Sequence, residues 1–179
     1  MSLRGAHRLG PDNATLSVRT GRTGAAARAG HDLLIDVTAW AATLELDDDP
    51  AQSRISLDAD ATSLRVREGS GGLQALGEDD KDSIRQTIDD DVLHGKGIEF
   101  RSTEVASDGE DGRIDVRGEL TLVGTTRPVA FDLLVGADGS LSARAIVKQT
   151  EWGIKPYSAL FGALKVVDEV EVTLDAGPR

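Results

Sequence analysis

Apolar and polar residues alternate along most of this chain, most regularly between residues 113 and 135. Val116, Gly118 and Leu120 fall on one side, and charged or polar residues separate them. Because successive side chains of a strand point to opposite faces of a sheet, the pattern predicts two half-buried strands of one hairpin. We expect the turn within residues 124–128, Gly-Thr-Thr-Arg-Pro, after which Val129 and Phe131 resume the apolar face.

The same alternation recurs in other short segments along the chain. Residues 47–50, 107–112 and 136–140 are rich in Asp, Gly and Pro and are typical of turns. Many short strands joined by such turns predict an antiparallel meander, either a barrel or a sandwich. The strand segments are residues 14–18, 33–40, 42–46, 55–59, 64–66, 98–100, 114–122, 129–135, 141–147 and 170–174.

One segment departs from the strand period. Ile84, Ile88 and Val92 are spaced four residues apart, which places them on one face of a helix. Asp80 or Asp82 is a suitable N-cap and a glycine at position 95 a suitable end, so we expect the main helix over residues 80–93.

A second apolar segment, residues 152–164, separates the last two strands. It contains Trp152, Tyr157 and Phe161, half of the six aromatic residues in the chain. We expect residues 156–164 to form a short C-terminal helical cap, with Pro156 in its first turn. An exposed apolar connection would be an aggregation hazard, so the segment should fold over one barrel end, either as a gate or as a plug that closes the core.

Composition bounds the remaining possibilities. The net charge of -11 disfavours binding to nucleic acid and peripheral docking on anionic membranes. No stretch approaches the ~20 apolar residues of a membrane span, and no signal-peptide core is visible near the start. We therefore expect a soluble, cytoplasmic protein with a flexible N-terminal tail, residues 1–13, before one domain, residues 14–176.

Candidate chemistry is sparse. His31 could serve as a base, but its neighbour Asp32 would point to the opposite face of a strand. The acidic run at residues 89–91 could supply oxygen ligands to Ca²⁺ or Mg²⁺, yet consecutive helix residues splay around the axis. The chain has no cysteine. We therefore predict no metal, no cofactor and no catalytic residues.

The hairpin sequence G-x-L-T-L-x-G-T-T-x-P-V, residues 118–129, resembles the signature of the YceI-like family of lipocalin-type polyisoprenoid-binding proteins. Residues 98–102 are similar to the family's F-x-S strand, and residues 152–172 to its closing segment. The resemblance implies an all-β fold, an antiparallel eight-stranded barrel with one crossing helix. It also implies binding of a long isoprenoid or acyl chain in the barrel, and a homodimer.

We therefore expect non-covalent binding of a long apolar molecule, for storage or transport. Two alternatives remain open at this stage: an enzyme, a hydrolase or isomerase using His31, and a structural module with a filled barrel. Small inward residues such as Gly118 would leave room for a ligand. The predicted ligand-binding residues are Leu57, Phe100, Leu120, Leu122, Phe131, Leu133, Ala143, Ala145, Trp152, Tyr157 and Phe161.

Overall fold

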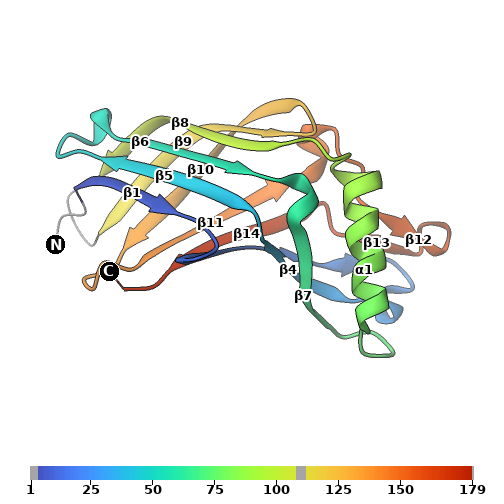
Figure 1. Ribbon diagram of the computed structural model, residues 1–179. Coiled ribbons are helices and arrows are strands. Elements are labelled where there is room, and N and C mark those ends of the chain that lie inside the picture. The colour runs from blue at the N-terminus through green and yellow to red at the C-terminus, as the bar shows by residue number, and fades with distance from the viewer. Residues whose placement is uncertain (1–3, 108–111, 179) are drawn as a thin grey trace.

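The computed structural model describes residues 4–107 and 112–178 of the chain. One large antiparallel sheet curls around an apolar core, and a helix crosses its end beside a small second sheet (Figure 1). The large sheet has the order β1-β5-β6-β8-β9-β10-β11-β14-β2-β4-β7. Its strands are β1 Gly5–Leu9, β2 Ala14–Thr20, β4 Asp32–Val37, β5 Trp40–Leu46, β6 Arg54–Ala59, β7 Leu64–Ser70, β8 Ile98–Ser107, β9 Arg113–Leu122, β10 Thr125–Val135, β11 Leu141–Lys148 and β14 Glu169–Ala176.

A bent hairpin joins the two ends of this sheet. β4 runs almost directly into β5, and β6 into β7, yet β4 and β7 pair beside β2 whereas β5 and β6 pair beside β8. The hairpin therefore closes the curl. Counting each bent pair once, and setting the edge strand β1 apart, leaves the eight barrel strands predicted. The antiparallel lipocalin-like fold is thus confirmed, although the large sheet has eleven separate strands in the described part of the chain.

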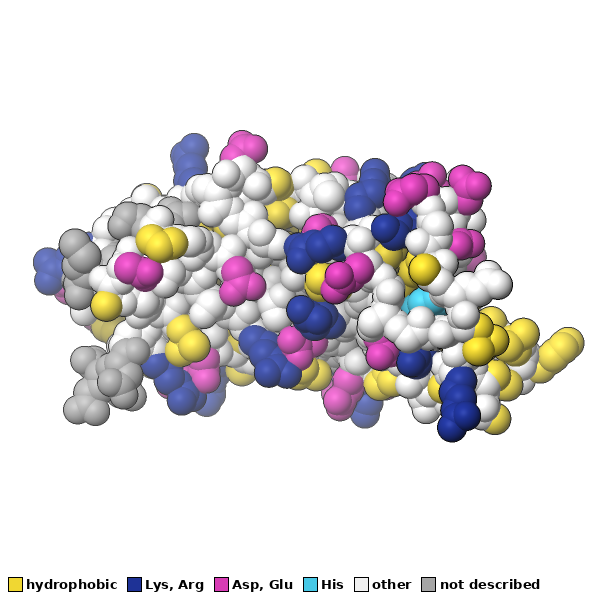
Figure 2. All heavy atoms as spheres, turned by 90° about the horizontal axis from the view of Figure 1, so that it is seen from below, with side chains coloured by type: hydrophobic (Ala, Val, Ile, Leu, Met, Phe, Trp, Pro, Cys, Tyr) yellow, Lys and Arg dark blue, Asp and Glu magenta, His cyan; other side chains and the backbone are white. Residues whose placement is uncertain are grey.

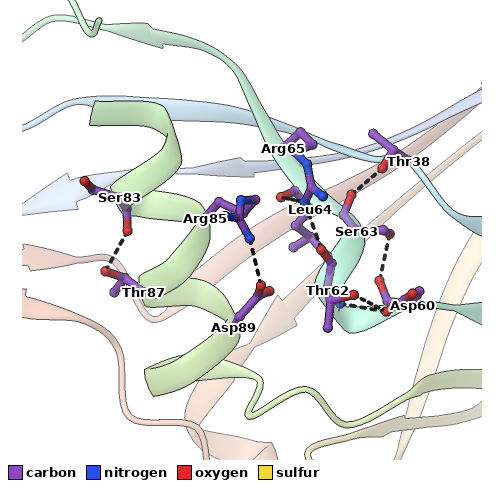
Figure 3. Close-up of polar contacts among 10 residues, drawn as sticks. All are labelled: Thr38, Asp60, Thr62, Ser63, Leu64, Arg65, Ser83, Arg85, Thr87 and Asp89. Carbon is purple, nitrogen blue, oxygen red and sulfur yellow. Dashed lines mark hydrogen bonds and ion pairs between the residues drawn. The ribbon is translucent and has the colours of Figure 1, made fainter. Parts of the chain in front are cut away.

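Local hydrogen bonds fix the bend (Figure 3). The Thr38 hydroxyl donates to the Ser63 carbonyl at 2.7 Å, and the Ser63 hydroxyl donates to the Asp60 carbonyl at 2.7 Å. The Asp60 carboxylate accepts from the Thr62 hydroxyl and amide, which lowers its pKa below the ordinary value. Backbone groups that have no partner strand at the bend thus find hydrogen-bond partners within the bend itself.

The β9–β10 hairpin has the predicted faces but a different turn. Thr125 already pairs with Leu122, so the loop is only Val123-Gly124, and residues 125–128 belong to β10. Both loop residues have positive φ, 51° and 75°, as a two-residue turn of the I′ type requires. Valine is strained there, and packing of its side chain against the core offsets part of that strain.

The predicted helix is present with a shifted start. α1 spans Glu78–Thr87 and continues as a π-helical turn, Ile88–Val92. Gly77 is the N-cap, and the Asp80 side chain, predicted as the cap itself, instead accepts a hydrogen bond from the Gly77 amide at 2.9 Å. Gly95 follows the helix with φ of 64°, in agreement with its predicted role.

Two local predictions are wrong. Residues 156–164 form no cap helix: β12 (Ser158–Ala159), a single 3₁₀ turn (Leu160–Gly162) and β13 (Leu164–Val166) pair with β3 (Arg22–Thr23) in a three-stranded sheet. The expected flexible tail contains β1, which pairs with β5 and buries Leu9. Most of the turn predicted at residues 107–112 lies outside the described residues.

Gly118 illustrates why small inward residues do not always leave space. A Cβ at Gly118 would lie 2.4 Å from the Arg101 carbonyl oxygen and 2.6 Å from the ring of Phe100. The glycine therefore seats the phenyl ring against β9, and the room it appears to provide is already filled. At this position the prediction from residue size alone is wrong.

We expect Gly118→Ala to lower the free energy of unfolding by about 1–3 kcal/mol, because the methyl group meets backbone that cannot move freely. Gly97→Ala is the matched control, since nothing lies within 4 Å of its Cβ position. Urea unfolding measures both variants. Equal stability of the two would contradict the close packing at residue 118.

Candidate functional site: an apolar cavity inside the curled sheet

The curled sheet encloses a cavity of about 600 Å³, within the usual range for ligand sites. Its wall is built by inward side chains of the barrel strands, because alternate residues of each strand face the interior. The lining is almost wholly aliphatic or aromatic in its depth. Such a space excludes charged molecules, which would lose their hydration without gaining partners, and accepts apolar ones.

Nine of the eleven predicted ligand-binding residues line this cavity. They come from β6, β8, β9, β10 and β11 and from the segment before β12, so residues far apart in sequence converge. That they contact a ligand stays a prediction. The nine are Leu57, Phe100, Leu120, Leu122, Phe131, Leu133, Ala143, Ala145 and Tyr157.

Trp152 and Phe161 lie elsewhere. Trp152 is buried, and its indole Nε1 donates to the Leu120 carbonyl at 2.8 Å, so it braces the wall from behind. Phe161 is fully exposed at the 3₁₀ turn, which is incompatible with the plug reading for this side chain. Period-two reasoning could place neither residue because both lie outside the long strands.

Two phenylalanines form the aromatic part of the wall. The rings of Phe100 and Phe131 lie 5.4 Å apart at an angle of 56°, a tilted arrangement favoured by ring quadrupoles. Phe100 rests on Gly118, which fixes its position. Elsewhere small residues, Ala143 and Ala145, face the same cavity.

Sequence reasoning found the apolar helix face but did not assign it to the site. Ile84, Ile88 and Val92 of the α1 segment all line the cavity. Their four-residue spacing could have indicated this role, because an amphipathic helix that crosses a barrel must pack its apolar face inward. Buried Gln149 was missed too; it lines the cavity while its side-chain nitrogen donates to the Val167 carbonyl at 3.1 Å.

The mouth lies between α1 and the small sheet, where the wall becomes polar and exposed. Arg22, His31, Ser83 and Lys165 line this end. The Arg22 guanidinium donates to the Gly30 carbonyl at 2.6 Å and the Ser70 carbonyl at 2.9 Å. The bond to Ser70 fastens the start of the glycine-rich segment, residues 69–77, beside the mouth, and the bond to Gly30 ties it to the start of β4.

His31 shows no catalytic arrangement with a carboxylate. Its Nε2 lies 2.6 Å from the Gln74 carbonyl oxygen, a contact that ties the same loop to the mouth. Asp32 instead lies 4.0 Å from Arg22. In the acidic run at residues 89–91, Asp89 pairs with Arg85 (Figure 3). Within residues 4–107 and 112–178 no group of His, Asp and Glu is arranged to hold a metal.

Two solved structures share this architecture. BcnA of Burkholderia cenocepacia is 16% identical, with a TM-score of 0.65 and coverage of 90% of this chain and 94% of that protein. The YceI protein of Campylobacter jejuni is 12% identical, with a TM-score of 0.54 and coverage of 81% and 84%. At these identities the likeness shows the fold alone. No curated protein matches the sequence.

A curled antiparallel sheet around an apolar cavity defines a lipocalin-like protein. The sequence matches the YceI-like domain over residues 11–177, so the chain belongs to the YceI-like family. That family is known for binding apolar, polyisoprenoid-like ligands. Among the described residues, none of the helices has the length and apolar character needed to cross a membrane.

Trp152→Phe should destabilise the fold more than Trp40→Phe, by about 1–2 kcal/mol. Both changes replace a buried indole by a phenyl ring, but only Trp152 loses a hydrogen bond, because the Trp40 Nε1 has no partner among the described residues. Chemical denaturation measures the difference. If Trp40→Phe proves equally costly, the bracing role of Trp152 is wrong.

Proposed function

We propose that this protein binds one long apolar molecule, an isoprenoid or acyl chain, inside the curled sheet, for storage or transport. The observation that carries the proposal is the cavity of about 600 Å³ with an apolar depth and a polar mouth. Membership of the YceI-like family supports the same ligand class. A cavity of this size also favours a binder over a filled barrel.

The driving force is the removal of apolar surface from water. Each buried CH₂ group contributes about 0.8 kcal/mol, so a chain of about ten carbons gains roughly 8 kcal/mol before entropy costs. Among the residues that the structure describes, no buried charged side chain lines the cavity, so ligand entry desolvates no buried charge. Affinity should therefore follow chain length until the cavity is full.

The polar residues at the mouth support one orientation of the ligand. Arg22, His31 and Lys165 lie at this end, whereas Leu133 and Val37 line the depth. A molecule with a polar head and an apolar tail would place the tail inward, because a buried polar head would lack partners. We accordingly favour prenyl or acyl compounds with a single anionic or hydroxyl head.

Native mass spectrometry of the purified protein tests the proposal first: a co-purifying lipid mass is the expected result. A fluorescent prenyl probe then gives an affinity for the protein stripped of lipid. Saturable binding that strengthens with chain length supports the proposal. No binding of probes of any length, in a correctly folded protein, would contradict it.

Filling the cavity should weaken probe binding. Ala143→Phe puts a phenyl ring into the cavity and should weaken binding at least about tenfold, because the ligand loses the space. Ala130→Phe is the control, since Ala130 is exposed on the outer face of neighbouring β10. Fluorescence titration compares the two. Unchanged affinity of Ala143→Phe at unchanged stability would place the ligand outside the cavity.

A further inference from the structure

The connection between β12 and β13 forms an exposed apolar tip, defined here as residues 157–164. Phe161 is 112% exposed, Leu160 57% and Tyr157 46%. In Figure 1 this connection projects at the end of the molecule beyond α1, and in Figure 2 hydrophobic side chains gather at the same end. Large apolar side chains grouped in this way usually mark a contact surface.

The backbone holds these side chains outward at a cost. Leu160 and Phe161 both have positive φ, 52° and 56°, a region that bulky residues rarely adopt. Residues held in this region are strained, and they persist only where the surrounding structure or a function requires them. Phe161 is fully exposed and gains no packing in return, and Leu160 is covered only in part. The conformation therefore indicates a partner that is itself apolar.

Charge is segregated around the same tip. Residues 20–31 and 155–167, which the small sheet brings together, contain Arg22, Arg28, Lys155 and Lys165. All 31 Asp and Glu residues of the chain lie outside these two segments. Arg28, Lys155 and Lys165 are exposed, and none of them has an ion pair within the described residues.

The tip also borders the mouth of the cavity. Tyr157 and Leu164 belong to both, Lys165 follows the tip directly and also lines the cavity, and the opposite side of the mouth is formed by α1. That helix begins with Glu78, Asp79 and Asp80, so its first turn is anionic, whereas the segments around the tip carry only cations. An anionic surface would be attracted to the tip and repelled by the helix, which selects one orientation.

We propose that the tip docks on the surface of an anionic phospholipid bilayer. Phe161 and Leu160 enter the region below the headgroups, Lys155 and Lys165 contact phosphates, and Tyr157 lies at the interface, where tyrosines are favoured. Resting on the proposed function, this docking lets an apolar ligand pass between bilayer and cavity without crossing water. The local surface overrides the net charge of -11, which by itself predicts no such docking.

Co-sedimentation of the full chain with vesicles tests the proposal. Vesicles of phosphatidylcholine with phosphatidylglycerol should bind the protein, and Phe161→Asp should reduce the partition coefficient at least about tenfold. Leu134→Asp is the matched control, because Leu134 is 48% exposed on β10, away from the tip and the mouth, and it should leave binding unchanged. The double variant Lys155→Glu, Lys165→Glu should lower the partition coefficient on the same vesicles at least about tenfold.

A second measurement locates the contact. Brominated lipids should quench the tryptophan fluorescence of Phe161→Trp more strongly than that of the wild type, because the native Trp40 and Trp152 are buried. Absent vesicle binding by the wild type, or binding that Phe161→Asp leaves intact, overturns the proposal. Dissociation of a homodimer by Phe161→Asp, in sedimentation velocity without vesicles, combined with no vesicle binding, would show instead that the tip contacts a second copy.

Membrane docking and ligand binding can be tested independently. Prenyl-probe affinity in vesicle-free solution should be the same for Phe161→Asp and wild type, because Phe161 does not line the cavity. Probe binding without vesicle binding would overturn the docking and leave the function standing. Vesicle binding without probe binding would leave the docking and contradict the function.

Discussion

The bent hairpin is the constraint on which the rest of the structure depends. A sheet of this size must dispose of its two edges, and here one chain segment crosses from one end of the sheet order to the other. The bond from Thr38 to Ser63 and the turn at Asp60 hold that bend. Because the sheet curls, its inward residues face each other across a space instead of packing on a second sheet, and the cavity results.

Most of the fold could be predicted from the alternation of apolar and polar residues along the strands. Alternation along residues 113–135 predicted the faces of β9 and β10. Eight of the eleven predicted ligand-binding residues line the cavity because the strand period placed them on the inward face, and the ninth lining residue, Tyr157, lies outside the strands. The spacing of Ile84, Ile88 and Val92 predicted the crossing helix in the same way. Periodic signals succeed here because burial on one face acts on every second or every fourth residue.

The predictions that were wrong concern segments whose conformation depends on residues far away in the sequence. The turn at Val123-Gly124 follows from strand register, and a valine with positive φ gives no local warning. Residues 156–164 are apolar enough for a helix, but pairing of β13 with β3, far away in sequence, decides their conformation. β1 is ordered by its pairing with β5. Cavity space at Gly118 was likewise misjudged, because the ring of Phe100 fills it.

The most direct test of the account is a methyl NMR experiment on the protein with a long-chain prenyl alcohol. Nuclear Overhauser contacts from the ligand chain to the methyl groups of Leu120, Leu133 and Ala143 are predicted, since all three line the cavity. The hydroxyl end should contact residues at the mouth. Ligand contacts confined to exposed Leu160 or Leu134, with no change at the three wall residues, would contradict the account.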